Sequence, residues 1–579
     1  MKKLIELIKT KKYMHYIIII VVALLVSIPF FWIQLKGTHD GKYHLLRLIG
    51  LDYATGESSF PFLVFPFFCK DWGYSMMAFY PPLVTYIPYI LGLISGAFHV
   101  GLKLFGTLTT ILSGIFMYNF INEVTKKKGI ALLSAIIYII MPYRFENLYN
   151  RFALGEFTAF IFIPIVFQGL YNLLHGDKKR HYYIAIGATG LLLSHSISTL
   201  YTAFFCLIYI LFNLKLFFKK DVIIKCIINV VFILLMSAMF WIPMLEFSSE
   251  ADYAIMQSEI MKTDSKHVAD RTIEVWQFLK DKEEDIGVSF IFGIHFAVML
   301  LIGILAYRNI DKKFKDFYII NLLLGIIGIF MCTNFFPWRI MPDIMGLLQF
   351  PWRMLGFAYF FFTPVCALNI YYLINPIKRE WVRNIIYALV FIILAVCTVF
   401  ELKIYTTDDI TQDTKYEEYN YQNPQIHYFS INRDNMPVKA LIEQNDYLKE
   451  RTNDDVYVLS GNVEIVNQNK HALHMEFEVK NADMGTQLEL PYLFYPGYDV
   501  ILQYDDKEVD LEITESENGF LQVVIPENIE NGKVTVDYNA TILDKVAYVI
   551  SGISIIVFII YVICYRKKMK KEATDENKN

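Results

Sequence analysis

Charged residues are scarce in this sequence. They make up 19% of its 579 residues, against about 25% in an ordinary soluble protein, and the mean hydropathy is +0.38. This shortage excludes a soluble enzyme, a disordered chain and the usual basic nucleic-acid binder, so we expect no nucleic-acid partner.

Cysteine is also rare, and the familiar motifs of soluble enzymes are missing. None of the seven cysteines lies in 403–542, which excludes a disulfide framework for that stretch. The sequence has no phosphate-binding glycine loop, no paired CxxC, no HExxH and no nucleophile elbow. Any catalytic site must therefore be inferred from residue clusters.

Apolar residues, in contrast, are abundant and grouped. They make up 55% of the chain and form blocks of about 17–25 residues, each long enough to cross a hydrocarbon core of about 30 Å. The first block, 17–33, is too long for a signal-peptide core and has no small-residue cleavage site, so we expect it to remain as a spanning helix. The sequence predicts a polytopic α-helical membrane protein embedded in a lipid bilayer.

Lysine and arginine fall in short connections that the positive-inside rule places in the cytoplasm. The predicted spans are 17–35, 100–122, 130–142, 158–174, 184–198, 200–217, 222–244, 287–307, 317–334, 354–374, 384–402 and 543–565. If 81–97 also crossed, every later basic cluster would change sides, so we interpret it as an interfacial helix. This gives about twelve spans in the plasma membrane, with both termini cytoplasmic.

The stretch 403–542 differs from the rest in charge and pattern. It holds 27 acidic and 10 basic residues, a net charge of −17, whereas the whole chain carries −4. Within it, 455–539 alternates with period two between turn signals, which is typical of short strands. We expect three parts: a transmembrane body (1–402), an acidic extracellular β-sandwich-like domain (403–542), and a final span with a basic cytoplasmic tail (543–579).

The first polar cluster follows the first predicted span. It contains His39, Asp40, His44 and Arg47. A carboxylate at the outer boundary can accept a proton from a hydroxyl, or bind a divalent ion together with a histidine. The structural alternative is a helix N-cap, a common role for Asp before a helical run.

The second cluster lies between two predicted spans. It contains Arg144, Glu146, Arg151 and Glu156. Arginine suits phosphate because its planar fork donates two hydrogen bonds to two oxygens. The alternative is a set of loop salt bridges with arginines that reach toward the interface.

The third cluster repeats a Pro-Trp-Arg triplet, ending at Arg339 and at Arg353. Two arginines at the outer boundary could hold a phosphate, or the Trp-Arg pairs could anchor the chain at the interface. The fourth candidate is His195, at a predicted helix hairpin. For it, and for His295 inside a predicted span, a structural role is the more frequent one.

Several of these segments resemble a group of bacterial membrane proteins called 6-pyruvoyl-tetrahydropterin synthase-related and, beyond them, the YfhO-like family. They also resemble, more distantly, the GT-C membrane glycosyltransferases. The matching segments are 39–41, 79–83, 143–156, 192–195, 348–353, 494–498 and 505–507. The Phe-Pro-Trp-Arg element at 350–353 is the most specific of them. Nothing in the chain matches the zinc–histidine site of a soluble pterin synthase.

The resemblance implies a GT-C-like fold and a sugar transfer on the outer face, from a polyprenyl-phosphate donor to a cell-envelope acceptor. Asp40 would then act as the base, or as the ligand of a divalent metal ion if one is used. Glu146 or Glu156 would be the second acidic position. The donor phosphate would be held by Arg339 and Arg353, with Arg144 or Arg151.

Two other functions fit the same composition. A lipid or polysaccharide transporter would need charged residues deep inside its spans, whereas the strong charges here fall at the outer ends. A non-catalytic envelope scaffold would depend on the β-domain and not on Asp40.

Overall fold

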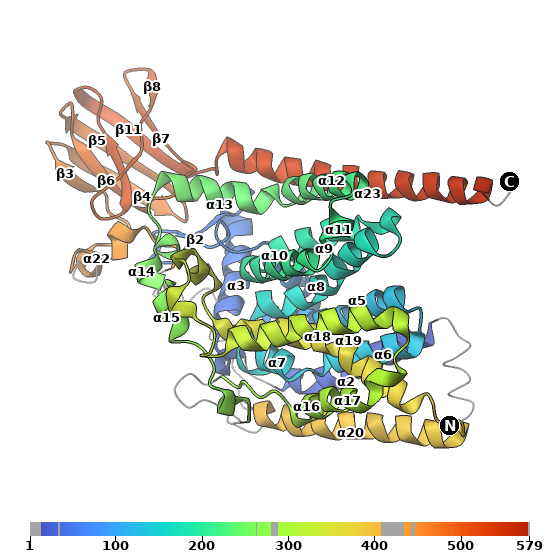
Figure 1. Ribbon diagram of the computed structural model, residues 1–579. Coiled ribbons are helices and arrows are strands. Elements are labelled where there is room, and N and C mark those ends of the chain that lie inside the picture. Colours follow the sequence, from blue (N-terminus) through green and yellow to red (C-terminus); the bar gives the residue numbers. More distant parts are fainter. Residues whose placement is uncertain are drawn as a thin grey trace.

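The computed structural model describes residues 13–32, 35–261, 263–279, 288–406, 434–441 and 446–576. Helices form a bundle of roughly parallel rods, and a β-domain stands at one end of it (Figure 1). Helix α3, Gly41–Glu57, runs crosswise to the bundle near this end (Figure 1).

Seven helices are long and apolar enough to cross a membrane. They are α2 (Met14–Ser27, continued by η1, Ile28–Phe31), α5 (Phe98–Thr125), α8 (Leu154–Leu174), α18 (Lys312–Cys332), α19 (Met354–Ile374), α20 (Glu380–Thr406) and α23 (Ile542–Glu576).

Two further spans are possible as bent helix pairs. In the first, α6 (Lys128–Ile139) meets α7 (Pro142–Phe145) and the π-helical turn η3 (Glu146–Asn150) at 45°. Pro142 opens α7, where its missing N–H costs nothing, but it prevents α6 from continuing straight. In the second pair, α12 (Lys220–Met236) meets α13 (Ala238–Glu250) at 67°.

The expected count of twelve spans differs from these seven to nine. The difference lies in three predicted spans that correspond to shorter helices: α9 (Tyr183–Leu192), α10 (Ser196–Leu211), and α16 (Ile294–Leu301) with α17 (Gly303–Ala306). A polytopic helical membrane protein is confirmed by helix length and hydropathy, whereas twelve crossings and a cytoplasmic location of both termini stay predictions.

The segment expected at the interface forms α4, Leu83–Ser95. It packs onto α5 at very close range. A Cβ built on Gly101 of α5 would lie only 2.4 Å from the backbone nitrogen of Gly92 in α4. Only glycine permits two helices to approach so closely at this point.

A β-sheet domain is present near the C-terminus, with strands β3–β11 between Tyr457 and Tyr538, whereas the bounds 403–542 stay a prediction. One sheet has the order β4-β5-β11-β7-β8, the other β3-β6-β10-β9, and all pairings are antiparallel. The strands are β3 (Tyr457–Ser460), β4 (Glu464–His471), β5 (His474–Ala482), β6 (Gln487–Leu493), β7 (Tyr498–Tyr504), β8 (Lys507–Asp510), β9 (Thr514–Glu515), β10 (Phe520–Val524) and β11 (Ile529–Tyr538). Much of 404–450, the part of the predicted domain before the first strand, lies outside the described residues.

The β-domain docks on the loop between α3 and α4, which carries the short strands β1 (Val64–Phe65) and β2 (Tyr74–Ser75). The Trp72 ring packs edge-on against Phe520 at 5.0 Å between centroids. The backbone carbonyl of Trp72 accepts a hydrogen bond from the Leu493 amide at 2.9 Å. On the bundle side, Tyr253 stacks on Tyr495 at 5.7 Å.

The tryptophans of the repeated Pro-Trp-Arg triplets are buried in the protein and do not act as interfacial anchors. Trp338 is 1% exposed, and its ring N–H donates to the Met331 carbonyl at 3.0 Å. Trp352 is 7% exposed and stacks on Phe350 at 4.4 Å. Both rings are packed inside the protein, so they anchor loops to helix ends and not the protein to a bilayer.

Candidate active site

A buried ion pair forms the centre of the candidate site. Glu156, in the first turn of α8, lies 2.9 Å from Arg151, and both side chains are under 10% exposed. The Tyr143 hydroxyl donates to the other Glu156 oxygen at 2.6 Å. Asn147 accepts from Arg151 at 2.6 Å, so the guanidinium is held on two sides.

A second arginine approaches the same carboxylate. Arg353 ends the turn η10 (Pro351–Arg353) just before α19, and its Nε lies 3.5 Å from Glu156 Oε2. Its Nη1 donates to the Gln349 side chain at 3.0 Å. The Tyr201 hydroxyl holds this loop by donating to the carbonyls of Leu348 and Phe350. Two cations thus share one carboxylate, which leaves a local excess of positive charge.

Asp40 lies beside these arginines. Its backbone N–H donates to the Arg151 carbonyl at 2.9 Å. It occupies the N-cap position of α3, yet its side chain does not cap the helix. Thr38 does so instead, accepting from the Gly41 amide at 3.0 Å. In the part of the chain that the structure describes, no hydrogen bond or ion pair engages the half-buried Asp40 carboxylate.

The electrostatics of Asp40 suit a base. Burial raises the pKa of its carboxyl above the ordinary value, and the positive charges of Arg151 and Arg353 oppose that shift. A carboxylate that needs a higher pH to ionise is also a stronger proton acceptor once it has done so.

The three candidate histidines lie in different settings. His195 caps α10, since its Nδ1 accepts from the Ser198 amide at 3.1 Å, which leaves the proton of a neutral ring on Nε2. Its ring also lies close to Gly155, next to Glu156. His39 is exposed, whereas His44 is 3% exposed among the rings of Tyr43, Tyr80 and Phe152.

Three of the candidate residues lie elsewhere. Arg144 is fully buried between helices and donates to Ser113, Thr109 and Thr110 on α5. Glu146 is also fully buried, and accepts from Asn150 at 2.7 Å and from the Ser289 amide at 3.1 Å. Arg339 is at the surface, where it pairs with Asp270 at 2.8 Å.

Sequence reasoning did not single out several residues that build this site. Tyr143, Asn147 and Gln349 orient the charged groups, and no composition signal marks them. Arg47 belongs to the first polar cluster of the sequence, and no spacing rule assigns it a role. The residue is 1% exposed, and its guanidinium carbon lies 3.2 Å from the centroid of the Tyr80 ring. A buried arginine on a face with two tyrosines adds a third positive charge near Asp40.

The charged groups nearest Asp40 are mainly arginines. In the described ranges, no group of three or more His, Cys, Asp or Glu side chains could hold a metal ion. What Asp40 faces is arginine, which binds anions and not metals. The site can therefore accept a proton at Asp40 and stabilise negative charge at Arg151 and Arg353.

Comparison by sequence finds a relative but no family. No family model matches the chain, so membership in the YfhO-like or 6-pyruvoyl-tetrahydropterin synthase-related proteins is not supported. A protein of Lactococcus lactis subsp. cremoris (strain MG1363), described as an uncharacterized protein, is 23% identical over 617 residues, with 98% of each chain covered.

Comparison by structure finds glycosyltransferases at low similarity. The arabinofuranosyltransferase AftD from Mycobacteria has a TM-score of 0.47 and 12% identity, over 69% of this chain and 27% of its own. The Archaeoglobus fulgidus oligosaccharyltransferase has a TM-score of 0.39 and 14% identity, over 72% of this chain and 59% of its own. This chain thus spans about a quarter of AftD, and the activities named for these proteins are not transferred by the likeness.

Proposed function

We propose that the protein is a membrane glycosyltransferase that moves a sugar from a polyprenyl-phosphate donor to a cell-envelope acceptor on the outer face. The observation that carries this proposal is the unengaged carboxylate of Asp40 beside Arg151 and Arg353. The kind of donor comes from the resemblance of the segments around Asp40 and Arg353 to GT-C enzymes.

In this reaction the acceptor hydroxyl attacks the anomeric carbon of the donor sugar. Asp40 accepts the hydroxyl proton as the new C–O bond forms. The bond between the anomeric carbon and the phosphate oxygen breaks, and the leaving phosphate gains negative charge. Arg151 and Arg353 stabilise that charge, since fixed cations at a site of developing charge lower the barrier.

Glu156 has a different role in this scheme from the one first expected. Its carboxylate is already engaged by two arginines and a tyrosine, so it positions the cations and is not a second base. Glu146 is likewise a positioning residue, because both of its oxygens accept hydrogen bonds inside the bundle.

The test is mass spectrometry of envelope glycopolymers from cells with the wild-type protein, a deletion, or Asp40→Asn at matched expression. We expect the deletion and Asp40→Asn to lose the same sugar. The matched control is Asp270→Asn, an exposed carboxylate paired with Arg339 at the surface, which should keep that sugar.

The outcomes separate the candidate functions. Loss in the deletion but not in Asp40→Asn contradicts the catalytic assignment. An unchanged set of glycans in every strain contradicts the glycosyltransferase proposal itself and favours a transporter or a scaffold.

A further inference from the structure

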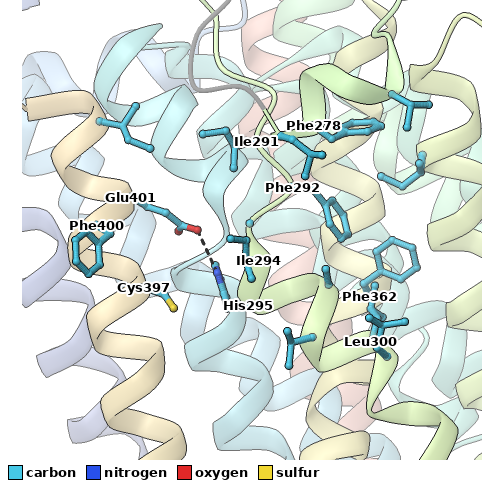
Figure 2. A pocket seen from close by; sticks show the side chains of 18 of the residues that line it. Phe278, Ile291, Phe292, Ile294, His295, Leu300, Phe362, Cys397, Phe400 and Glu401 are labelled. Atoms are coloured by element: carbon cyan, nitrogen blue, oxygen red, sulfur yellow. Dashed lines mark ion pairs between the residues drawn. The ribbon is translucent and has the colours of Figure 1, made fainter.

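A large apolar groove lies apart from the arginine cluster. It has a volume of about 930 Å³, within the range of about 300–1,000 Å³ typical of small-molecule sites. Its walls come from η6 (Val275–Leu279), α16, α18, α19 and α20. Figure 2 shows the side chains around it, with Phe278 and Ile291 near one end and Leu300 near the other.

Exposed apolar side chains surround the opening of the groove. Ile294, Leu301 and Phe400 line it and are 80%, 64% and 65% exposed. Since α18, α19 and α20 are candidate spans, we expect this surface to face the bilayer. A ligand can thus enter sideways from the bilayer, and its occupant needs a hydrocarbon chain.

One ionisable pair interrupts the apolar wall. His295 Nδ1 lies 3.1 Å from Glu401 Oε1 (Figure 2), and the two residues are 6% and 9% exposed. The other polar atom of each, His295 Nε2 and Glu401 Oε2, has no hydrogen-bond partner among the described residues. Buried polar atoms at membrane depth are costly unless they are satisfied.

The chemistry of this pair selects the head of the ligand. With its proton on Nδ1, toward Glu401 Oε1, the His295 ring is an acceptor at Nε2. Glu401 Oε2 is also an acceptor, so each of the two atoms needs a hydrogen bond from a separate hydroxyl. A phosphate only accepts, and it would bring negative charge to Glu401. No lysine or arginine is among the described residues that line the groove, so nothing there would offset that charge.

We propose that this groove binds a membrane lipid with an uncharged hydroxyl headgroup. The hydrocarbon chain lies along α16 and α20, and two hydroxyls of the head donate to His295 Nε2 and Glu401 Oε2. The site is separate from the arginine cluster and opposite to it in chemistry, because that cluster suits an anion. It does not depend on whether the protein transfers a sugar.

The test is native mass spectrometry of the full chain in detergent with two matched probes. Monooleoylglycerol and oleoyl lysophosphatidic acid share a chain and a glycerol unit, but the second carries a phosphate. We expect monooleoylglycerol to bind at least about tenfold more tightly. Glu401→Gln should reduce this discrimination, since it removes the negative charge.

A matched pair of tryptophan substitutions locates the site. Val298→Trp fills the groove and should weaken monooleoylglycerol binding by about tenfold. Val230→Trp on α12, at a similarly exposed valine outside the groove, should not. If the Val298→Trp variant bound monooleoylglycerol as tightly as the wild type does, the proposed location would be wrong. This variant keeps His295 and Glu401, so it still tests the location if Glu401→Gln fails to fold.

Two other results would overturn the headgroup. One is equal binding of the two probes by the wild type, and the other is tighter binding of oleylamine, which would show that the site takes a cation. Asp40→Asn should bind monooleoylglycerol normally, so failure of the lipid site and failure of the proposed transferase are distinguishable.

Discussion

At the scale of single residues, the proposed base makes a prediction about pH. Burial raises the pKa of the Asp40 carboxyl, so the reactive carboxylate forms at a higher pH than for an ordinary aspartate, whose pKa is about 3.9. The rate of sugar transfer should therefore rise with pH along a limb centred above that value. A pH–rate profile measures it, and a limb that persists in Asp40→Asn would assign it to another group.

The two arginines of the repeated triplet predict a contrast. Arg353 approaches Glu156 in the cluster, whereas Arg339 is 72% exposed in its side chain and pairs with Asp270. Arg353→Gln should lower kcat by about 10²–10³-fold, the usual loss for a group that stabilises developing charge. Arg339→Gln should be close to wild type. Equal losses of kcat in the two variants would contradict the assignment of Arg353 to the site, because Arg339 lies outside the cluster around Glu156.

The sequence located these charges better than it assigned their partners. Arg151 and Glu156 are five residues apart across the turn into α8, so their proximity follows from local spacing. Arg353 joins the pair from η10, the turn before α19, nearly two hundred residues later in the chain. Only the packing of α8 against α19 and this turn shows that contact. Arg144 looked equivalent to Arg151, but the turn after Pro142 directs it into the bundle toward α5.

Glu401 is an acidic residue within a predicted span, a feature of the sequence that can indicate a site. It lies at the outer end of that span, 384–402, where an ionisable side chain next to an apolar block can mark a site. The sequence could not show that His295, more than a hundred residues earlier, would stand 3.1 Å away.

At the scale of elements, the β-domain contains a buried ion pair that should control its stability. Arg451 and Glu489 lie 3.1 Å apart with both side chains 0% exposed. Arg451→Met leaves the Glu489 charge uncompensated and should cost about 3–5 kcal/mol, seen as a lower Tm of the full chain. The surface pair of Lys533 and Glu476, at 2.7 Å, is the control, and Lys533→Met should leave Tm nearly unchanged. A smaller loss for Arg451→Met than for Lys533→Met would contradict this.

The turn that leads into β7 contains the segment 494–498, one of the segments that carry the sequence resemblance, and its geometry explains the residues found there. Gly497 has φ +102, and a Cβ there would lie 2.7 Å from the Ala540 backbone. Tyr495, just before it, is 1% exposed and stacks on Tyr253. The motif therefore holds the domain in place, and its pattern in the sequence reflects docking more directly than chemistry.

At the scale of the whole molecule, the loop between α3 and α4 joins the bundle to the β-domain. Trp72 is 3% exposed and packs on Phe520. Trp72→Ala should cost about 3–5 kcal/mol of docking energy, and it should speed amide hydrogen exchange in 64–75 while β5 and β11 stay protected. Unchanged exchange in 64–75 would mean that other contacts hold this loop.

The same contact has a consequence for synthesis. The Trp72 ring N–H donates to the Thr452 carbonyl, 380 residues later in the chain. At about 5–20 residues per second, roughly 20–80 s separate the emergence of the two partners from the ribosome. During that interval the loop after α3 is complete but uncovered, and a nascent chain that stalls before Thr452 presents an apolar tryptophan that only its own unmade end can bury.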